Sequence, residues 1–254
     1  MFSWGNNWEI CYQEFKPLVV PFDMVQESIK TNKIRNNKFF VDYFQGEILD
    51  IGGGTTPVTP SAQIFDLQHG DAQHILKYLE PESFDCVHSS HCLEHMEDVS
   101  LAISQWWSLV RVGGYLVLVV PDEDLYEQGV WPSMFNSDHK HTFTISKTKS
   151  WSPVSVNIKE MLTTLDGALA LSIVLQDDGY DHNLIRKRLT PFRHSLWNYK
   201  KDTGVKRMVK HLLFLLLYYP LYVVFVSKKG RYIDQTEGDA LAQIQVVIKK
   251  IINS

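Results

Sequence analysis

The sequence predicts an α/β fold built on an open, mostly parallel sheet. Short apolar runs typical of strands recur at 47–51, 62–67, 84–90 and 115–120, and a segment of helical spacing lies at 97–112. The run YLVLVV at 115–120 is apolar throughout, as a strand covered on both faces is. Strand, helix, strand in this order forms right-handed crossover units, which place the strands parallel to one another.

The length and composition fit a soluble globular chain with a substantial core. The chain has 254 residues, of which 44% are hydrophobic, so extensive disorder is not expected. Its three cysteines lie in apolar surroundings and are an odd number, which argues against a disulfide framework. The N-terminal residues lack the basic and apolar regions of a signal peptide. We therefore expect a cytoplasmic protein.

The second half of the chain divides into further predicted elements. A polar and aromatic loop, a helix, a strand and a final strand are predicted at 122–144, 156–170, 171–178 and 241–251. This gives three predicted regions: an N-terminal cap at 1–45, an α/β core at 46–185 and 236–254, and a helical, apolar and basic insert at 186–235.

A glycine loop follows the first predicted strand in the stretch ILDIGGGTTP, residues 48–57. Gly52, Gly53 and Gly54 let the backbone approach a ligand at the carboxyl end of that strand. A P-loop needs Lys-Ser/Thr after its last glycine, and none is present. A dinucleotide loop needs a third glycine, and Pro57 stands in its place. Both phosphate-binding interpretations are therefore weakened.

Other motifs accompany this loop in a fixed order. They are Asp50, Asp66, Gly70-Asp71-Ala72, FDCVHSSHCLEH at 84–95 and VVPD at 119–122. The series resembles the class I S-adenosylmethionine-dependent methyltransferases, in particular the small-molecule group with an LDIGGG loop and an LEH motif. It covers about residues 45–145 and the last predicted strand. The resemblance implies a Rossmann-like sheet of seven strands with helices on both faces.

The same resemblance implies S-adenosylmethionine as cofactor and a set of residues that bind it. This cofactor carries an ammonium group, a ribose diol and an adenine, but no phosphate. The implied residues are the loop glycines, Asp50 near the ammonium group directly or through water, Asp66 at the ribose hydroxyls, Asp71 and Ala72 at the adenine, and Ser89 and Ser90 near the methionine end. Asp66 lies close to the glycines and Asp71 soon after, so the division of ribose and adenine contacts between them stays open.

A catalytic base is predicted in DHKH, residues 138–141, on the side where acceptors enter. Methyl transfer to a hydroxyl requires removal of its proton, and a histidine held by a carboxylate can remove it. His139 or His141 with Asp138 supplies these groups, and a solvated loop is the alternative. It also stays open whether positioning alone suffices.

Two groups of residues resemble metal sites, and neither is favoured. His88, His91, Cys92 and His95 have zinc-like spacing, but His88 lies in a predicted strand, so the four side chains are not expected to converge. His91 at the end of that strand is a candidate to face the active site. Asp122, Glu123 and Asp124 are a less favoured site for a divalent ion. The sequence prediction therefore includes no metal.

The predicted insert concentrates positive charge around an apolar centre. Residues 186–231 hold twelve Lys and Arg residues and one acid, Asp202, in a chain of net charge −4. The uncharged stretch 212–227 would be about 24 Å long as a helix, shorter than the ~30 Å membrane core, and it contains Pro220. It is either a lid over the acceptor pocket or a contact with an anionic membrane surface, and the charge favours the membrane. Nucleic acid is not expected, because the aromatic residues alternate with leucines.

The sequence therefore predicts a methyltransferase acting on a small-molecule, glycan or lipid-linked acceptor, with oxygen the favoured target. Its expected location is cytoplasmic, with a peripheral place at the inner face of the membrane as a further expectation. Two alternatives stay open: an NAD(P)-dependent Rossmann oxidoreductase, and a non-catalytic, membrane-associated scaffold that keeps the fold.

Overall fold

The computed structural model describes residues 27–184, 209, 212–213, 216 and 232–252. Residues 1–26 of the predicted cap and most of the predicted insert lie outside the described residues. The lid and membrane interpretations of 212–227 therefore stay predictions. Within the described ranges, no helix is both long and apolar enough to cross a membrane.

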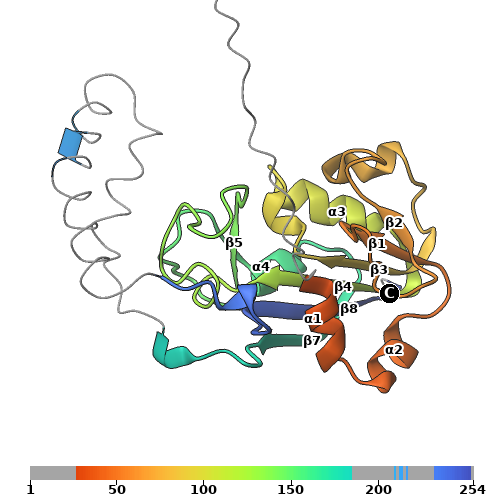
Figure 1. The fold of residues 1–254 in the computed structure, drawn as a ribbon. Helices are drawn as coiled ribbons and strands as arrows, with labels where there is room; N and C mark the ends of the chain where they lie inside the picture. The colour runs from red at the N-terminus through yellow and green to blue at the C-terminus, as the bar shows by residue number, and fades with distance from the viewer. Residues whose placement is uncertain (1–26, 185–208, 210–211, 214–215, 217–231, 253–254) are drawn as a thin grey trace, which may run out of the picture.

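The centre of the fold is a six-stranded sheet of order β2-β1-β3-β4-β8-β7 (Figure 1). The strands are β1 Ile48–Ile51, β2 Gln63–Phe65, β3 Phe84–Ser90, β4 Val110–Pro121, β7 Ala168–Gln176 and β8 Gln243–Lys250. The pairs among β2, β1, β3 and β4 are parallel, whereas β8 runs antiparallel to both β4 and β7. The α/β fold predicted from alternating strands and helices is confirmed.

Seven strands were predicted for this sheet, and the described residues form six. The segment between β2 and β3, residues 66–83, holds the 3-10 helix η1 Ala72–Lys77 and turns. A further parallel strand would need crossover connections of a dozen or more residues each. This segment is too short to supply them, so β2 is the edge strand on that side.

Apolar side chains cover both faces of the sheet because successive residues of a strand point to opposite sides. On one face, Leu116, Leu118 and Val120 of β4 belong to the main core with helices α3 Val99–Leu109 and α4 Ile158–Thr163. On the other face, Val117 and Cys86 pack with Phe44 beyond helix α2 Asn37–Tyr43. Helices therefore cover both faces, as predicted (Figure 1).

The helix predicted at 156–170 is wrong over most of its length. Strand β6 Ser155–Asn157 pairs with β5 Thr142–Thr144, α4 then has only six residues, and β7 begins at Ala168. The φ of Gly167 is +65°, a left-handed conformation that ends the helical segment. Pairing of the following residues with β8 outweighs their helical spacing.

The N-terminal helix α1 Glu27–Ile34 is linked to the start of β8 by polar contacts. Thr31 Oγ1 accepts a hydrogen bond of 2.8 Å from Gln243 Nε2, and Arg35 Nε donates one of 2.8 Å to Gln245 Oε1. Because β8 runs antiparallel to β4, its first residues lie beside the carboxyl end of β4. The predicted cap thus reaches the edge at which the parallel strands end.

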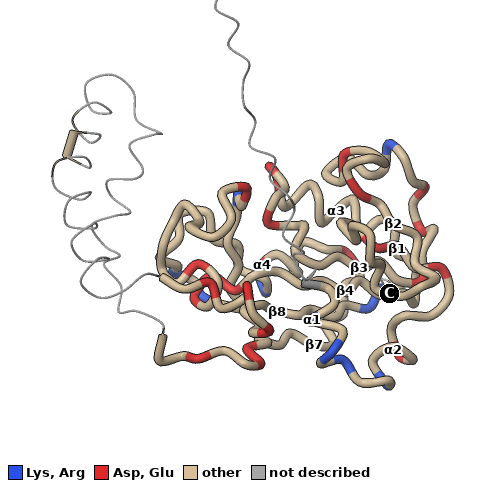
Figure 2. The backbone as a smooth tube through the Cα atoms, in the orientation of Figure 1, with Lys and Arg blue, Asp and Glu red and all other residues tan. Residues whose placement is uncertain are grey.

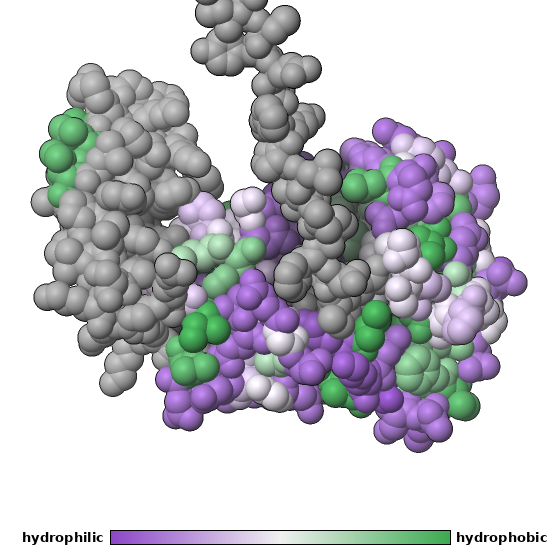
Figure 3. Space-filling view, viewed as in Figure 1, coloured by the Kyte–Doolittle hydropathy of each residue, from purple (hydrophilic) through white to green (hydrophobic). Residues whose placement is uncertain are grey.

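The surface of the described part is rich in acids. Among the charged segments of the tube in Figure 2, red Asp and Glu segments are more frequent than blue Lys and Arg segments, in keeping with the concentration of basic residues in 186–231. On the face seen in Figure 3, the apolar side chains of the described residues form small separate patches among hydrophilic ones. This distribution is that of a solvated surface.

Candidate active site

The glycine loop after β1 is held close to β2 by backbone contacts. The Gly52 amide donates to Phe65 O at 2.8 Å, and the Gly54 amide donates to Asp66 Oδ2 at 2.9 Å. Gly52 has a φ of +76°, and a Cβ there would lie 2.8 Å from the Cβ of Cys92. Both the left-handed backbone and the lack of space require glycine at this position.

Beneath the loop, Asp50 belongs to a buried polar chain. Its Oδ2 accepts from the Val58 amide at 2.6 Å, and its Oδ1 lies 2.7 Å from His88 Nδ1. The other ring nitrogen of His88 lies 3.4 Å from both terminal nitrogens of Arg35. Because a guanidinium only donates, His88 Nε2 is the acceptor and its Nδ1–H donates to Asp50. Asp50 therefore anchors the loop to the sheet.

The charges of Asp50, His88 and Arg35 in this buried polar network balance one another. Burial lowers the pKa of His88, and the attraction of Asp50 opposes that effect without reversing it, so the imidazole is neutral. Burial also lowers the pKa of Arg35 to about 10, which leaves the guanidinium charged beside the Asp50 carboxylate. His88 has a structural role, in line with its predicted place in a strand. The contact of Asp50 with the ammonium group stays a prediction.

The two aspartates predicted for ribose and adenine occupy different surroundings. Asp66 follows β2, is half-buried, and accepts from the amides of Gly54 and Leu67 at 2.9 and 2.7 Å. Asp71 caps η1 and is exposed, and its hydrogen bond with His74 lowers the pKa of the Asp71 carboxyl. Ala72 O accepts from Trp106 Nε1 at 2.8 Å. Asp66 is thus tied to the glycine loop by a hydrogen bond, whereas Asp71 makes its contacts within η1.

The serines at the end of β3 differ from each other. Ser89 is buried and donates to Ile51 O at 3.0 Å, so it ties β3 to β1. Ser90 Oγ is buried and has no hydrogen-bond partner among the described residues. A buried hydroxyl with no partner is costly unless a ligand or water satisfies it. Its position at the carboxyl edge fits a polar group of a bound cofactor.

A cluster of histidines surrounds Glu94 of the LEH motif. Glu94 is fully buried, and neither carboxylate oxygen has a hydrogen-bond partner among the described residues. His91 Nδ1, His139 Nε2 and His95 Nε2 lie 3.4, 3.9 and 4.0 Å from its Oε1. Burial acts to raise the pKa of Glu94, but the three histidines outweigh it and the pKa lies below its ordinary value. The cluster holds an ionised carboxylate away from water.

His91 has an unusual backbone at the end of β3. Its φ is +51°, which non-glycine residues rarely adopt and which occurs preferentially at functional sites. The ring is held by Gln243 Oε1, 2.9 Å from Nε2, so the first residue of β8 fixes it beside Glu94. This places His91 at the carboxyl edge, where its role as an active-site residue stays a prediction.

The DHKH segment lies against this cluster, with pairings that differ from those predicted. The amides of Lys140 and His141 donate to Glu94 O at 2.8 and 3.2 Å. His139 is buried, and its Nδ1 lies 2.8 Å from Glu127 Oε1. His141 Nε2 lies 3.3 Å from Glu97 O. Glu127, rather than Asp138, holds His139.

Asp138 itself contacts a different histidine. Its Oδ2 lies 3.0 Å from His95 Nδ1, and its side chain is 74% exposed. Sequence reasoning had no signal for Glu127, which stands twelve residues before His139 in an irregular loop. Glu94 and His95 were visible in LEH, but their convergence with His139 depends on the path of the loop before β5.

Of the three acids after β4, Glu123 and Asp124 converge on the Lys147 amine, whereas Asp122 bonds backbone amides. Glu123 is fully buried and accepts from Ser150, Ser155 and Lys147 at 2.7, 2.6 and 2.9 Å. Asp122 Oδ1 accepts from the amides of Asp124 and Leu125, both at 3.0 Å. Burial raises the pKa of Asp122 to about 6. Asp124 contacts Lys147 and Trp151. The less favoured alternative of a divalent ion at these acids stays a prediction.

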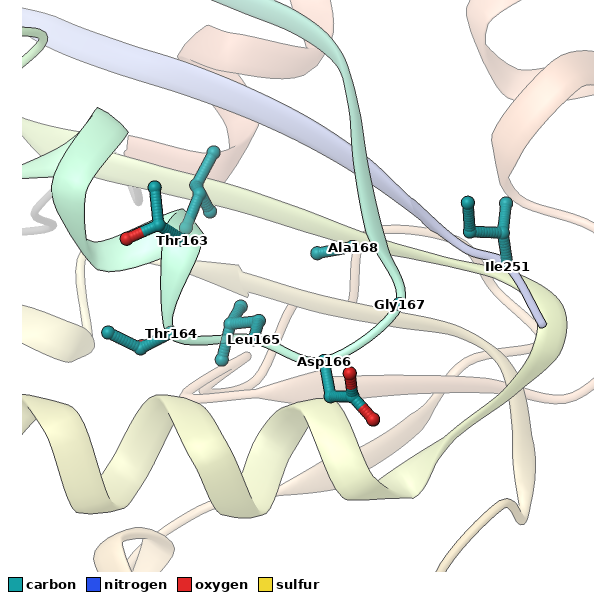
Figure 4. Close-up of a pocket in the computed structure, with 8 residues that line it drawn as sticks. Thr163, Thr164, Leu165, Asp166, Gly167, Ala168 and Ile251 are labelled. Atoms are coloured by element: carbon teal, nitrogen blue, oxygen red, sulfur yellow. The ribbon is translucent and has the colours of Figure 1, made fainter. Parts of the chain in front are cut away.

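A surface pocket elsewhere does not belong to this site. It is lined by the segment after α4, the first residue of β7 and Ile251, as Figure 4 shows. The start of β7 pairs with the end of β8, at the edge opposite the glycine loop. The pocket therefore lies where the parallel strands begin rather than where they end.

The family model described as a methyltransferase domain matches residues 4–118. No curated protein sequence matches.

Several solved structures are similar. A SAM-dependent methyltransferase from Archaeoglobus fulgidus is 16% identical, with coverage of 88% of this chain and 94% of that one and a TM-score of 0.44. The YcgJ protein from Bacillus subtilis is 12% identical, with coverage of 83% and 94% and a TM-score of 0.42. Phosphoethanolamine N-methyltransferase 2 of Haemonchus contortus, in complex with phosphomonomethylethanolamine and S-adenosylhomocysteine, is 16% identical, with coverage of 82% and 49% and a TM-score of 0.42.

The site fits the cofactor that the family uses. The glycine loop leaves no space for side chains, Asp66 lies against the Gly54 amide, and the Ser90 hydroxyl lacks a partner among the described residues. These groups lie at the carboxyl edge of a sheet whose order follows the α/β pattern expected from the sequence. The methyltransferase-domain match over residues 4–118 supports an S-adenosylmethionine-dependent methyltransferase, with S-adenosylmethionine as its cofactor.

Proposed function

We propose that the protein methylates an oxygen of a small-molecule, glycan or lipid-linked acceptor. The observation that supports this is the imidazole–carboxylate cluster of His91, Glu94, His95 and His139 at the carboxyl edge. When bound, the cofactor supplies a methyl group on a sulfonium that an acceptor oxygen can attack. The chain has to orient the acceptor and accept the proton that its hydroxyl loses.

His139 is the proposed base. Glu127 lies 2.8 Å from its Nδ1, which fixes the ring and stabilises the imidazolium that forms when Nε2 takes up a proton. His141 is the alternative base. Its Nε2 points at Glu97 O, an acceptor, so that nitrogen carries the proton and Nδ1 remains for base chemistry. Asp138 contacts His95 rather than His139, so its proposed role is to position the His95 ring.

Radiolabelled cofactor and a panel of hydroxyl, amine and carbon acceptors test this proposal. We expect label in a hydroxylated acceptor, and a fall in kcat of about 10²–10⁴-fold for His139→Ala, because that is the usual contribution of a general base. S-adenosylhomocysteine should bind the variant as tightly as it binds the unchanged protein. Label in amines alone would refute O-methylation, and an unchanged rate in His139→Ala would leave His141→Ala as the decisive variant.

Calorimetry separates the enzyme from the alternatives. S-adenosylhomocysteine should release heat on binding and NAD should not; the reverse result would favour an oxidoreductase. A scaffold without catalysis would bind the cofactor product and transfer no label to any acceptor in the panel.

We also propose that residues 186–231 contact anionic lipid at the inner face of the membrane. The support is the separation of charge in the sequence, with acidic residues more frequent than basic ones along the described backbone (Figure 2). Each basic residue near such a surface contributes about 1 kcal/mol to binding. The full-length protein should float with phosphatidylserine vesicles at low salt and be released by high salt. Failure to float would leave the lid as the function of this segment.

A further inference from the structure

We propose that Glu94, His95 and His139 form a binding site for a divalent transition-metal ion such as Zn²⁺. One carboxylate oxygen and one ring nitrogen from each histidine lie within 4.8 Å of one another. Glu94 and His95 come from the short 3-10 helix after β3, and His139 from the loop before β5. The site thus joins two segments that are far apart in the sequence.

Both histidines are oriented as metal ligands usually are. His95 Nδ1 lies 3.0 Å from Asp138 Oδ2, and His139 Nδ1 lies 2.8 Å from Glu127 Oε1. Metal-bound histidines almost always donate the opposite ring N–H to a carboxylate or carbonyl, which fixes the tautomer. With Nδ1 held in this way, each Nε2 faces the Glu94 carboxylate, at 4.0 and 3.9 Å.

Glu94 is the second, independent indication. Its side chain is completely buried, and both oxygens lack a hydrogen-bond partner among the described residues. An ionised carboxylate in such a place is costly unless it is paired or coordinates a metal. The histidine nitrogens around Glu94 lie 3.4–4.0 Å from its Oε1, and a bound cation would coordinate that oxygen directly.

The distances require a small adjustment on binding. Ligands about 2.0–2.1 Å from a tetrahedral ion lie roughly 3.3 Å from one another. The Glu94–histidine separations of 3.9 and 4.0 Å are therefore slightly open, within the reach of side-chain rotation. His91 Nδ1 lies 3.4 Å from the same Glu94 oxygen and orients this carboxylate, which leaves the fourth position of a tetrahedral ion open.

The ligand set indicates the class of metal. Two imidazoles with one carboxylate suit zinc and other first-row transition metals, whereas magnesium and calcium take oxygen ligands. An open coordination position would bind an acceptor oxygen and lower the pKa of its hydroxyl, a role that rests on the proposed O-methylation. With metal bound, His139 would be a ligand, the ion would lower the pKa of the acceptor hydroxyl, and His141, the alternative base proposed above, would accept the proton.

Zinc titration of the tag-free, full-length protein, stripped with chelator, tests the site by calorimetry. We expect one Zn²⁺ per chain, and a loss of affinity greater than about 10-fold in Glu94→Gln, His95→Ala and His139→Ala. His182→Ala is the matched control, because His182 also pairs with a carboxylate, Asp177 at 2.8 Å, but on the exposed surface. Its zinc affinity should be unchanged.

Circular dichroism and S-adenosylhomocysteine binding show whether each variant is folded. His95→Ala is the least disruptive of the three, since the His95 side chain is 25% exposed and Glu94 is fully buried. Absence of zinc binding to the unchanged protein, or equal affinity in a folded His95→Ala and the control, overturns the proposal. Zinc binding without methyl transfer refutes the proposed function and leaves the metal site standing.

Discussion

Replacement of Asp50 by asparagine tests whether this carboxylate is an anchor of the glycine loop or a direct partner of the cofactor. In the structure, Asp50 accepts one hydrogen bond from the Val58 amide and one from His88 Nδ1. Asparagine has a single oxygen, so its amide NH₂ group must face one of these two donors. The substitution also removes the negative charge near the buried Arg35 guanidinium.

The expected cost follows from these two losses. A buried donor left without an acceptor costs about 1–3 kcal/mol, and breaking a buried charge pair costs about 3–5 kcal/mol. The two effects share the same groups and do not add fully. We therefore expect the free energy of unfolding of Asp50→Asn to fall by about 3–5 kcal/mol.

Urea unfolding followed by circular dichroism measures this loss, with Asp42→Asn as the matched control. Asp42 pairs with Lys38 on an exposed helix surface, so the same chemical change there should have little effect. A destabilisation of Asp50→Asn below about 1 kcal/mol would refute the anchoring role. If the variant is as stable as the control but binds S-adenosylhomocysteine weakly, Asp50 contacts the ammonium group instead.

Three further outcomes are expected. Gly52→Ala should bind S-adenosylhomocysteine more weakly in calorimetry. The φ of +76° at Gly52 and the close Cβ of Cys92 would force the loop to move. Unchanged affinity would show that the loop does not bind the cofactor. Burial raises the pKa of Asp122 from its ordinary 3.8 to about 6 in the folded protein. The contribution of this group to the free energy of unfolding is therefore fully present below pH ~4 and is lost as the pH rises through ~6. Asp122→Asn should therefore be more stable than the unchanged protein at pH 8 and should flatten the pH dependence of urea unfolding between pH ~4 and ~7, and an unaltered slope would contradict this. Trp106→Ala should lower the free energy of unfolding by about 3–5 kcal/mol, because a completely buried ring and its hydrogen bond to Ala72 O are lost, and Trp106→Phe should cost less.

The sequence by itself predicted the fold class and the glycine loop, and the resemblance of its ordered motifs to the methyltransferases implied the cofactor. The fold class and the loop follow from local patterns: apolar runs of strand length, and a glycine loop directly after the first of them. Such patterns can be read from sequence because each is a short run of residues, although the space that requires glycine at position 52 is limited by Cys92, forty residues away. The helix predicted at 156–170 failed for the same reason, since helical spacing is local and pairing with β8 is not.

The tertiary structure decided which side chains meet. Asp50 was predicted at the cofactor, and the fold adds His88 and Arg35, the latter 15 residues away in a region predicted only as a cap. Asp138 was predicted to hold a neighbouring histidine, but the hydrogen bonds of the DHKH backbone to Glu94 O turn His139 inward to Glu127 and leave Asp138 with His95. Contacts of this kind depend on how loops from different strands cross at one edge of the sheet. No spacing along the chain encodes that crossing, so the cluster around Glu94 became visible only when the chain was folded.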